Sequence, residues 1–255
     1  MKHIYGPVSS WRLGKSLGID LLCSPGKICS FDCIYCQLEK TEKITKQRQD
    51  FVKIPELIED LKKALKETTP DVVTLSGMGE PTLAKNMSDA INEIRKITDI
   101  PIAILTNSTL FYNRKVIDSL KKTDIIVAKL DVANSELFQK INRPAKGIAF
   151  EQTLENIKKL REEFVGKFAL QIMFMNENKE YAKELAYIAR EIKPDEIQIN
   201  TPTRPCNIKP LSVAELDKIE EHFAGLNTVS VYHSAKPKTN PLDKIEIFRR
   251  RRKEV

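Results

Sequence analysis

Short apolar runs rich in β-branched residues alternate along the chain with longer stretches in which apolar residues recur every three or four positions. The first pattern is typical of buried strands and the second of amphipathic helices. The runs that predict strands are residues 17–22, 71–75, 101–106, 124–130, 167–174 and 196–200. The stretches that predict helices are residues 54–67, 85–97, 114–121, 150–163 and 179–192. This alternation predicts an α/β fold built on a parallel sheet.

The six predicted strands fit two architectures. A curved sheet would form an open or partial barrel, a flat sheet would be doubly wound, and strand periodicity does not choose between them. The proline-rich stretch 201–210 predicts a loop after the last strand. We expect one domain over residues 17–225, with an N-terminal extension over 1–16 and a basic C-terminal extension over 226–255.

Residues whose side chains can bind ligands or take part in catalysis follow the carboxyl ends of the predicted strands, where parallel α/β folds bind their ligands. They are Cys23, the cysteine-rich segment 29–36, segment 76–81, Thr106, Asn107, Asp131, Met173, Asn200 and Cys206. Because these strand ends meet at one edge of a parallel sheet, we expect the residues to share one face.

The charge balance is basic, since 42 Lys and Arg against 35 Asp and Glu give a formal net charge of +7. Part of the excess lies in the run 249–253. A basic balance favours phosphate-rich partners, whereas 30% charged residues also suit a solvated surface and the run suits a disordered tail. No apolar run is long enough to span a membrane and no signal-peptide pattern is present, so we expect a cytoplasmic protein.

Three cysteines, Cys29, Cys33 and Cys36, form the spacing C-x3-C-x2-C. Structural zinc usually takes four ligands in two close pairs, and no further cysteine or histidine lies within five residues of this triplet. Iron–sulfur clusters are held by thiolates in such tight runs. Three thiolates would hold three irons of a 4Fe–4S cluster and leave the fourth open. Structural zinc and three inert core cysteines remain alternatives, and an odd cysteine count disfavours a disulfide framework.

The triplet with Tyr35 before its last cysteine resembles the signature of radical S-adenosylmethionine enzymes. Segment 6–20 before the triplet and segment 36–38 at its end are similar to a short archaeal and bacterial branch grouped with wyosine synthases. The resemblance implies a partial (β/α)6 TIM-type barrel and two cofactors, a 4Fe–4S cluster held by the triplet and S-adenosylmethionine.

The segment Gly77-Met78-Gly79-Glu80-Pro81 is similar to the family's Gly-Gly-Glu-Pro motif, which binds the methionine amino group of S-adenosylmethionine. Gly79 and Glu80 match the motif, whereas Met78 departs from it. Glycine lets a backbone approach a ligand closely, and a glutamate accepts charge-assisted hydrogen bonds from an ammonium group. Without the cysteines, a glycine-rich turn after a strand would be read as structural.

The rest of the cofactor site is also implied by the resemblance. Thr106, Asn107 and Asp131 stand where the ribose and carboxylate of the cofactor would lie, although Asn107 is equally suited to cap the next helix. Tyr35, Gly77, Met173 and Asn200 complete the predicted set, Met173 toward the adenine.

Two cysteines outside the triplet, Cys23 and Cys206, are the candidate catalytic residues. A thiol at this face could trap a radical, donate a hydrogen atom, carry a methyl group or add a ligand, and Arg204 would favour a Cys206 thiolate. The alternative is that both are buried bystanders. Wyosine synthases carry extra cysteines for a second cluster, and two cysteines cannot supply one.

The expected function is therefore reductive cleavage of S-adenosylmethionine to a 5′-deoxyadenosyl radical, with a reducing ferredoxin or flavodoxin as electron donor. The charge and the wyosine resemblance make tRNA or another RNA base the expected substrate. A small metabolite or a peptide is the alternative substrate, and a non-catalytic iron–sulfur electron carrier or redox sensor is the alternative of another class.

Overall fold

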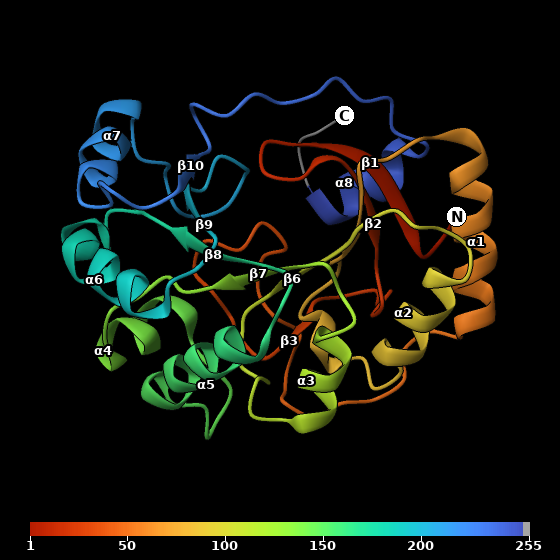
Figure 1. Ribbon diagram of the computed structural model, residues 1–255, viewed down its shortest axis with the longest axis horizontal. Coiled ribbons are helices and arrows are strands. Elements are labelled where there is room, and N and C mark those ends of the chain that lie inside the picture. The colour runs from red at the N-terminus through yellow and green to blue at the C-terminus, as the bar shows by residue number, and fades with distance from the viewer. Residues whose placement is uncertain (252–255) are drawn as a thin grey trace.

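An eight-stranded sheet curls through the centre of the molecule in the computed structural model, which describes residues 1–251 (Figure 1). Its strands stand in the order β1 (Ile4–Ser10), β2 (Gly14–Ile19), β5 (Val72–Leu75), β6 (Ile102–Thr106), β7 (Ile125–Lys129), β8 (Lys167–Met173), β9 (Glu196–Asn200) and β10 (Thr228–Ser230). β1 pairs with β2 antiparallel, and every other pair in the sheet is parallel. The sheet does not close on itself, so the fold is a partial barrel of the TIM type, as expected.

Helices cover the outer side of the curled sheet and leave its inner side to loops (Figure 1). The helices are α1 (Ile54–Glu67), α2 (Met87–Arg95), α3 (Arg114–Leu120), α4 (Ser135–Leu137), α5 (Phe150–Glu163), α6 (Ala182–Ile192), α7 (Val213–Glu221) and α8 (Lys244–Arg251). Short helical turns are η1 (Pro81–Leu83), η2 (Phe138–Asn142) and η3 (Lys179–Tyr181). In α1, Leu57, Leu61 and Ala64 are buried at helical spacing, so one apolar stripe faces the sheet.

All six strands expected from the apolar runs are present, as β2 and β5 to β9. The first one ends earlier than expected, because the Asp20 carboxylate accepts hydrogen bonds from the backbone N–H groups of Leu22 and Cys23 and turns the chain. Strands β1 and β10 were not expected. β1 contains Pro7, which lacks a backbone donor and is tolerated because β1 is an edge strand. Both strands lie in the segments predicted as extensions, and both belong to the sheet.

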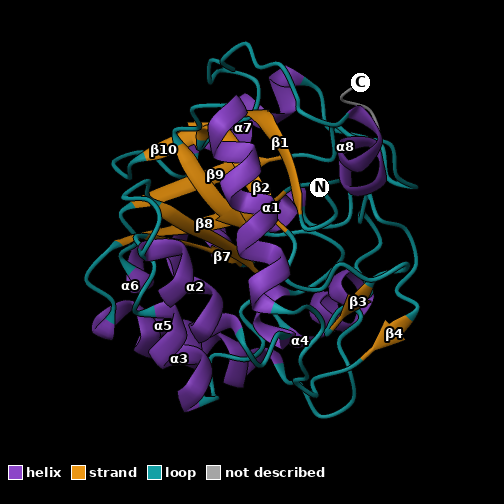
Figure 2. Cartoon of the chain, turned by 90° about the vertical axis from the view of Figure 1, so that its right-hand side faces the viewer, coloured by secondary structure: helices purple, strands orange, loops and turns teal. Residues whose placement is uncertain are grey.

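The C-terminal helix α8 packs against β1 (Figure 2). Its Arg250 side chain is fully buried and donates from Nε to the buried Asp20 carboxylate over 2.8 Å. The same guanidinium pairs with Glu246 and lies 5.2 Å from the centre of the Tyr5 ring. Because a buried charge is costly unless it is paired, this ion pair fixes α8 to the first two strands.

The basic run predicted at the C-terminus is helical in its described part, residues 249–251. Residues 252 and 253 of the run lie outside the described residues. No helix within residues 1–251 is long and apolar enough to cross a membrane.

A small second sheet lies beside the main one, in the connection between β2 and α1 (Figure 2). It consists of β3 (Ile28–Cys29) and β4 (Lys43–Ile44), which pair in parallel. The cysteine-rich segment begins at the end of β3, and its position is therefore fixed by this pairing and by contacts with the strand ends of the main sheet.

Candidate functional site

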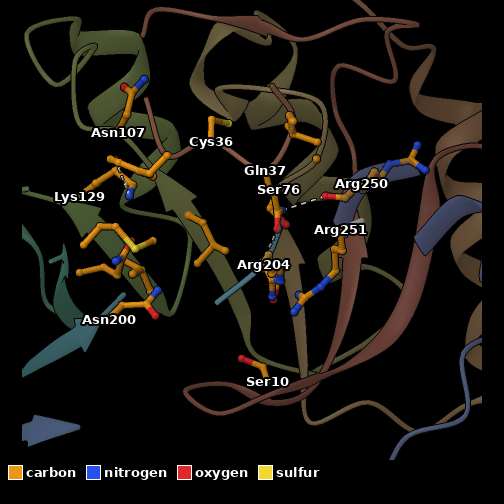
Figure 3. A pocket seen from close by; sticks show the side chains of 18 of the residues that line it. Ser10, Cys36, Gln37, Ser76, Asn107, Lys129, Asn200, Arg204, Arg250 and Arg251 are labelled. Atoms are coloured by element: carbon orange, nitrogen blue, oxygen red, sulfur yellow. Dashed lines mark hydrogen bonds between the residues drawn. The ribbon is translucent and has the colours of Figure 1, made fainter. Parts of the chain in front are cut away.

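A cavity of about 480 Å³ opens inside the curled sheet (Figure 3). Its walls come from the cysteine-rich segment, the carboxyl ends of β5 to β9, the turn between β1 and β2, the loop after β9 and the end of α8. This volume falls within the range of small-molecule sites, about 300–1,000 Å³. The expected convergence of the strand ends on one face is observed.

Cys29, Cys33 and Cys36 all line the cavity. Two amides support them: Asn107 Nδ2 lies 3.5 Å from Cys29 Sγ, and Asn142 Nδ2 lies 3.5 Å from Cys33 Sγ. Amide donors of this kind stabilise thiolates and tune the clusters that thiolates hold.

The spacing of the three sulfur atoms distinguishes between metals. Within residues 1–251, the only three His, Cys, Asp or Glu ligand atoms that gather within 4.8 Å of one another belong to Asp217, Glu220 and His233. The cysteine triplet does not meet that limit. Four sulfurs bound to one zinc ion at 2.3 Å would be about 3.8 Å apart. The wider triplet therefore fits a multi-iron cluster better than a zinc ion.

A buried ammonium group, that of Lys27, lies beside the triplet and is a site residue that the sequence did not single out. Burial by itself would lower the pKa of Lys27, but the charges of Cys36, Cys29 and Cys33 outweigh it and raise that pKa. Burial also raises the pKa of Cys29, to about 12. Since metal binding requires thiolates, the Lys27 cation offsets part of the cost of gathering three negative sulfurs in a buried site.

The turn that contains Gly79 is joined directly to the cysteine-rich segment. Ile28 N donates to Met78 O over 3.0 Å, and Glu80 N donates to Ile28 O over 3.1 Å. Gly79 has φ +142°, and a Cβ there would lie 1.7 Å from the Ile28 carbonyl oxygen. The close backbone approach that the sequence suggested for a ligand is therefore made to β3, and only a glycine permits it.

Glu80 is buried at the cavity wall, where burial raises its pKa. Its Oε1 atom accepts hydrogen bonds from Thr82 N, Thr82 Oγ1 and Thr106 Oγ1, while Oε2 accepts one from Asn107 N over 2.7 Å. A carboxylate oxygen has two lone pairs, so Oε2 retains acceptor capacity among the described residues. Gly77 lines the same wall.

Thr106 and Asn107 also line the cavity, but their side chains are engaged within the wall. Thr106 donates to Glu80, and Asn107 Nδ2 donates to Ser30 Oγ over 2.8 Å in addition to its contact with Cys29. Asn107 does not cap α3, because Asn113 does. Both residues thus hold the Glu80 turn and the cysteine-rich segment in place.

Asp131, expected at the cofactor, does not line this cavity. Its carboxylate accepts hydrogen bonds from the Tyr35 hydroxyl, from Asn142 Nδ2 over 3.0 Å and from Met173 N over 2.9 Å. Tyr35 covers it on the cavity side, with Lys129 Nζ 2.9 Å from the Tyr35 hydroxyl oxygen. The structure therefore gives Asp131 a positioning role behind Tyr35 and the end of β8.

The described geometry can be compared with known proteins. The model of the radical SAM superfamily matches residues 23–187, which is more than half of the chain. The chain belongs to the radical SAM superfamily. Enzymes of this superfamily use a 4Fe–4S cluster and S-adenosylmethionine, so the chain is a radical SAM enzyme of unspecified reaction. That part of the sequence-based resemblance is confirmed.

Relatives refine the placement within the superfamily. A UPF0026 protein of Synechocystis sp. is 41% identical over 82% of this chain and 77% of its own length, and the chain belongs with these UPF0026 proteins. A Brachyspira hyodysenteriae protein named GTPase Obg is 35% identical over 97% of this chain, which spans only 38% of that relative. A probable GTP 3′,8-cyclase of Saccharolobus islandicus is 23% identical over 86% of this chain and 68% of its own length.

Solved structures share the fold. SuiB of Streptococcus suis, solved with S-adenosylmethionine bound, superposes with a TM-score of 0.66 and 18% identity over 86% of this chain and 50% of SuiB. Archaeal TYW1 superposes with a TM-score of 0.56 and 14% identity over 83% of this chain and 72% of that protein. TYW1 is thus a distant likeness of fold, whereas the UPF0026 relatives are similar in sequence.

Neither candidate catalytic cysteine lines the cavity of this radical SAM chain. The Cys23 thiol donates to Lys2 O over 3.3 Å and lies 3.9 Å from an Arg250 nitrogen, beneath α8. The Cys206 thiol donates to Ile208 O over 3.3 Å. Their strand-end positions in the sequence suggested the active face, but local hydrogen bonds turn both sulfurs to backbone carbonyls.

Met173 and Asn200 line the cavity as expected, and they are register partners at the ends of β8 and β9. Gln171, two residues before Met173, lines it as well. It is 5% exposed, and its Nε2 atom has no hydrogen-bond partner within residues 1–251. An amide in an otherwise apolar strand is the signal by which the sequence could have pointed to it.

Proposed function

We propose that Cys29, Cys33 and Cys36 hold a 4Fe–4S cluster at which the enzyme cleaves S-adenosylmethionine, and that the substrate occupies the same cavity. The observation that carries the proposal is the arrangement of three cysteines at a cavity of about 480 Å³, which no other Cys and no His among the described residues lines. A cluster held by three thiolates leaves one iron for a non-protein ligand.

The chain's own residues would bind and orient the cofactor. Oε2 of Glu80 has the free lone pair needed to accept from an N–H of the methionine amino group, and the fold holds that oxygen against the cysteine-rich segment. Met173 and Asn200 would contact the nucleoside from the ends of β8 and β9.

The chemistry that the bound cofactors supply is transfer of one electron to the sulfonium, which breaks its bond to the 5′ carbon and yields methionine and a 5′-deoxyadenosyl radical able to take a hydrogen atom from the substrate. A reducing ferredoxin or flavodoxin is the proposed source of the electron. A non-catalytic electron carrier fits less well, because such carriers fill all four iron sites and the Cys23 thiol does not line the cavity.

Modification of an RNA base is the proposed finer function. The formal charge of +7 and a cavity wall rich in Arg and Lys support it. Binding of bulk tRNA should weaken steeply between low and moderate salt, because phosphate contacts release counterions. Affinity that does not change with salt would contradict phosphate contacts and leave a small metabolite or peptide as substrate.

The experiment that tests the proposal is product formation by anaerobically reconstituted protein given dithionite and S-adenosylmethionine. We expect methionine and 5′-deoxyadenosine from the unchanged protein. Glu80→Gln should raise the KM for S-adenosylmethionine by on the order of tenfold, since a charge-assisted hydrogen bond is lost. Glu93→Gln, at an exposed carboxylate of α2, is the matched control. Absence of both products from the unchanged protein would refute the proposal.

A further inference from the structure

Five exposed basic side chains lie on two segments that flank the cysteine-rich segment, and we call them the basic surface. Lys43 belongs to β4 and Lys46 follows it, while Lys140 belongs to η2 and Arg143 and Lys146 follow that turn. None of the five lines the cavity, whereas all three cysteines of the triplet do. The basic surface and the cavity therefore lie on different sides of the cysteine-rich segment.

Both segments of the basic surface are hydrogen-bonded to the backbone that carries the cysteines. Thr45 N donates to Cys29 O over 2.9 Å, and Ala145 N donates to Ser30 O over 2.8 Å. The two basic segments are thus direct backbone neighbours of the residues that would hold the cluster.

The two segments also meet each other. A Cβ on Gly147 would lie 3.0 Å from Lys46 Nζ, so the Lys46 side chain reaches the loop that contains Lys146. Figure 2 shows β4 at the edge of the molecule. In β4, Ile44 is 47% exposed and is the register partner of Cys29. An exposed apolar side chain therefore lies among the basic ones, next to a cysteine of the triplet.

The charge of the basic surface is of one sign. Residues 43–49 and 138–150 contain no Asp or Glu. The four lysines of the surface form no ion pair within residues 1–251, as the ion pairs of that part of the chain involve other lysines. A concentration of like charge at the surface attracts proteins of opposite charge and speeds their association.

The acidic side chains nearest to these segments in the sequence are directed elsewhere. The Asp32 carboxylate accepts a hydrogen bond from Thr41 N over 2.7 Å, although Arg143 also interacts with it electrostatically. The Glu42 carboxylate lies beside Gly26, where a Cβ would be 1.9 Å from it. Neither carboxylate therefore neutralises the four lysines.

The position of the basic surface fits an electron donor better than a substrate. A substrate has to enter the cavity, whereas an electron donor has only to come close to the cluster and leave again. A donor at the basic surface would leave the cavity to the cofactor and the substrate. Weak electron-transfer encounters use small interfaces, below about 1,200 Å², which suits a surface made by two short segments.

We propose that the basic surface docks an acidic electron-carrier protein of the flavodoxin or ferredoxin type. The proposal rests on the proposed function, because it names the docking site of the electron source for the same cleavage. The carrier gives up one electron to the cluster, and no bond or proton is exchanged in that step. Ile44 would supply an apolar contact and the lysines a charged rim, as in other transient interfaces.

The first test is calorimetric titration of oxidised flavodoxin, and separately of an oxidised 2Fe–2S ferredoxin, into anaerobically reconstituted protein at low salt. We expect binding that weakens as salt rises. Lys46→Glu/Lys146→Glu should weaken it by on the order of tenfold, because the reversed charges repel an acidic carrier, and Lys46→Gln/Lys146→Gln should weaken it less. Lys183→Glu/Lys218→Glu, at exposed lysines of α6 and α7, is the matched control with the same change of charge and should bind like the unchanged protein.

The second readout is product formation with two electron sources. With reduced flavodoxin as the limiting donor, Lys46→Glu/Lys146→Glu should form 5′-deoxyadenosine on the order of tenfold more slowly than the unchanged protein. With dithionite, which needs no protein docking surface, the two should be equal, which shows that the variant folds and binds its cofactors.

Three results would overturn the proposal. The first is that neither carrier binds the unchanged protein, and the second is that charge reversal leaves carrier binding unchanged. The third is that charge reversal weakens binding of bulk tRNA but not of the carrier, which would make the basic surface an RNA contact.

The outcome is separable from that of the proposed function. If a carrier binds through the basic surface but dithionite yields neither methionine nor 5′-deoxyadenosine, the proposed function fails and the docking surface stands. If dithionite yields both products but neither carrier binds, the reverse holds.

Discussion

Replacement of Gly79 by alanine should disrupt the junction between the Glu80 turn and the cysteine-rich segment. The added methyl group would lie 1.7 Å from the Ile28 carbonyl oxygen, and that oxygen belongs to the backbone and has no flexible side chain to move. Relief of the clash requires the two segments to separate. Separation breaks the hydrogen bonds from Ile28 N to Met78 O and from Glu80 N to Ile28 O.

The cost can be estimated from these contacts. Each lost backbone hydrogen bond contributes about 0.5–1.5 kcal/mol, and a side chain at positive φ adds about 1–2 kcal/mol. The free energy of unfolding should therefore fall by about 2–5 kcal/mol. Gly225→Ala is the matched control, because Gly225 has φ +81° and a Cβ there would meet no heavy atom within 4 Å. It should cost only the backbone strain, about 1–2 kcal/mol.

The assay has two readouts. Urea unfolding of the cluster-free proteins gives the free energies of unfolding, and iron content after anaerobic reconstitution reports on the cysteine-rich segment. We expect Gly79→Ala to lose more stability than Gly225→Ala and to incorporate less iron, because Ile28 precedes Cys29 directly. Equal free energies for the two variants, with full iron content in both, would refute the reasoning.

Three further predictions concern Arg250, Lys27 and Cys206. Arg250→Leu leaves Asp20 buried without its partner and should lower the free energy of unfolding by about 3–5 kcal/mol; an unchanged urea midpoint would contradict the role given to the pair. Lys27→Met removes a cation beside the three cysteines and should make the cluster's reduction potential more negative by on the order of 50 mV, measured by spectroelectrochemistry; an unchanged potential would exclude the interaction. Cys206→Ala should leave iron content and product formation within about twofold, and loss of either would restore a catalytic role for this thiol.

The strands and helices whose apolar residues follow a local pattern could be predicted from the sequence. Apolar runs such as 167–174 bury both faces of a parallel strand, and the pattern is visible without tertiary information. β1 could not be predicted in this way, because Gly6 and Pro7 interrupt its apolar pattern and its pairing with β2 is visible only in the folded structure. Helix α8 depends in the same way on the ion pair between Arg250 and Asp20, which are far apart in the sequence.

In the candidate site too, residues within a local motif could be predicted, whereas residues that only the fold brings together could not. Cysteine spacing and the Glu80 turn carry their chemistry in consecutive residues, so the sequence pointed to them. The contacts of Asp131 could not be predicted, because only the fold shows that its carboxylate accepts hydrogen bonds from Tyr35 and from the backbone of β8. The contact between Arg12 and Gln198, and the place of Gln171 beside Gln198 on the neighbouring strand, could be recognised only after β8, β9 and the turn before β2 had been placed together.

The central claim is that three cysteines hold a cluster whose fourth iron binds S-adenosylmethionine beside Glu80. Electron–nuclear double resonance on the reduced, reconstituted protein tests it most directly, with S-adenosylmethionine carrying ¹⁵N at the methionine amino group. We predict a ¹⁵N hyperfine coupling to the cluster that weakens in Glu80→Gln at the same cofactor concentration. A reduced cluster that shows no ¹⁵N coupling at saturating S-adenosylmethionine would contradict the account.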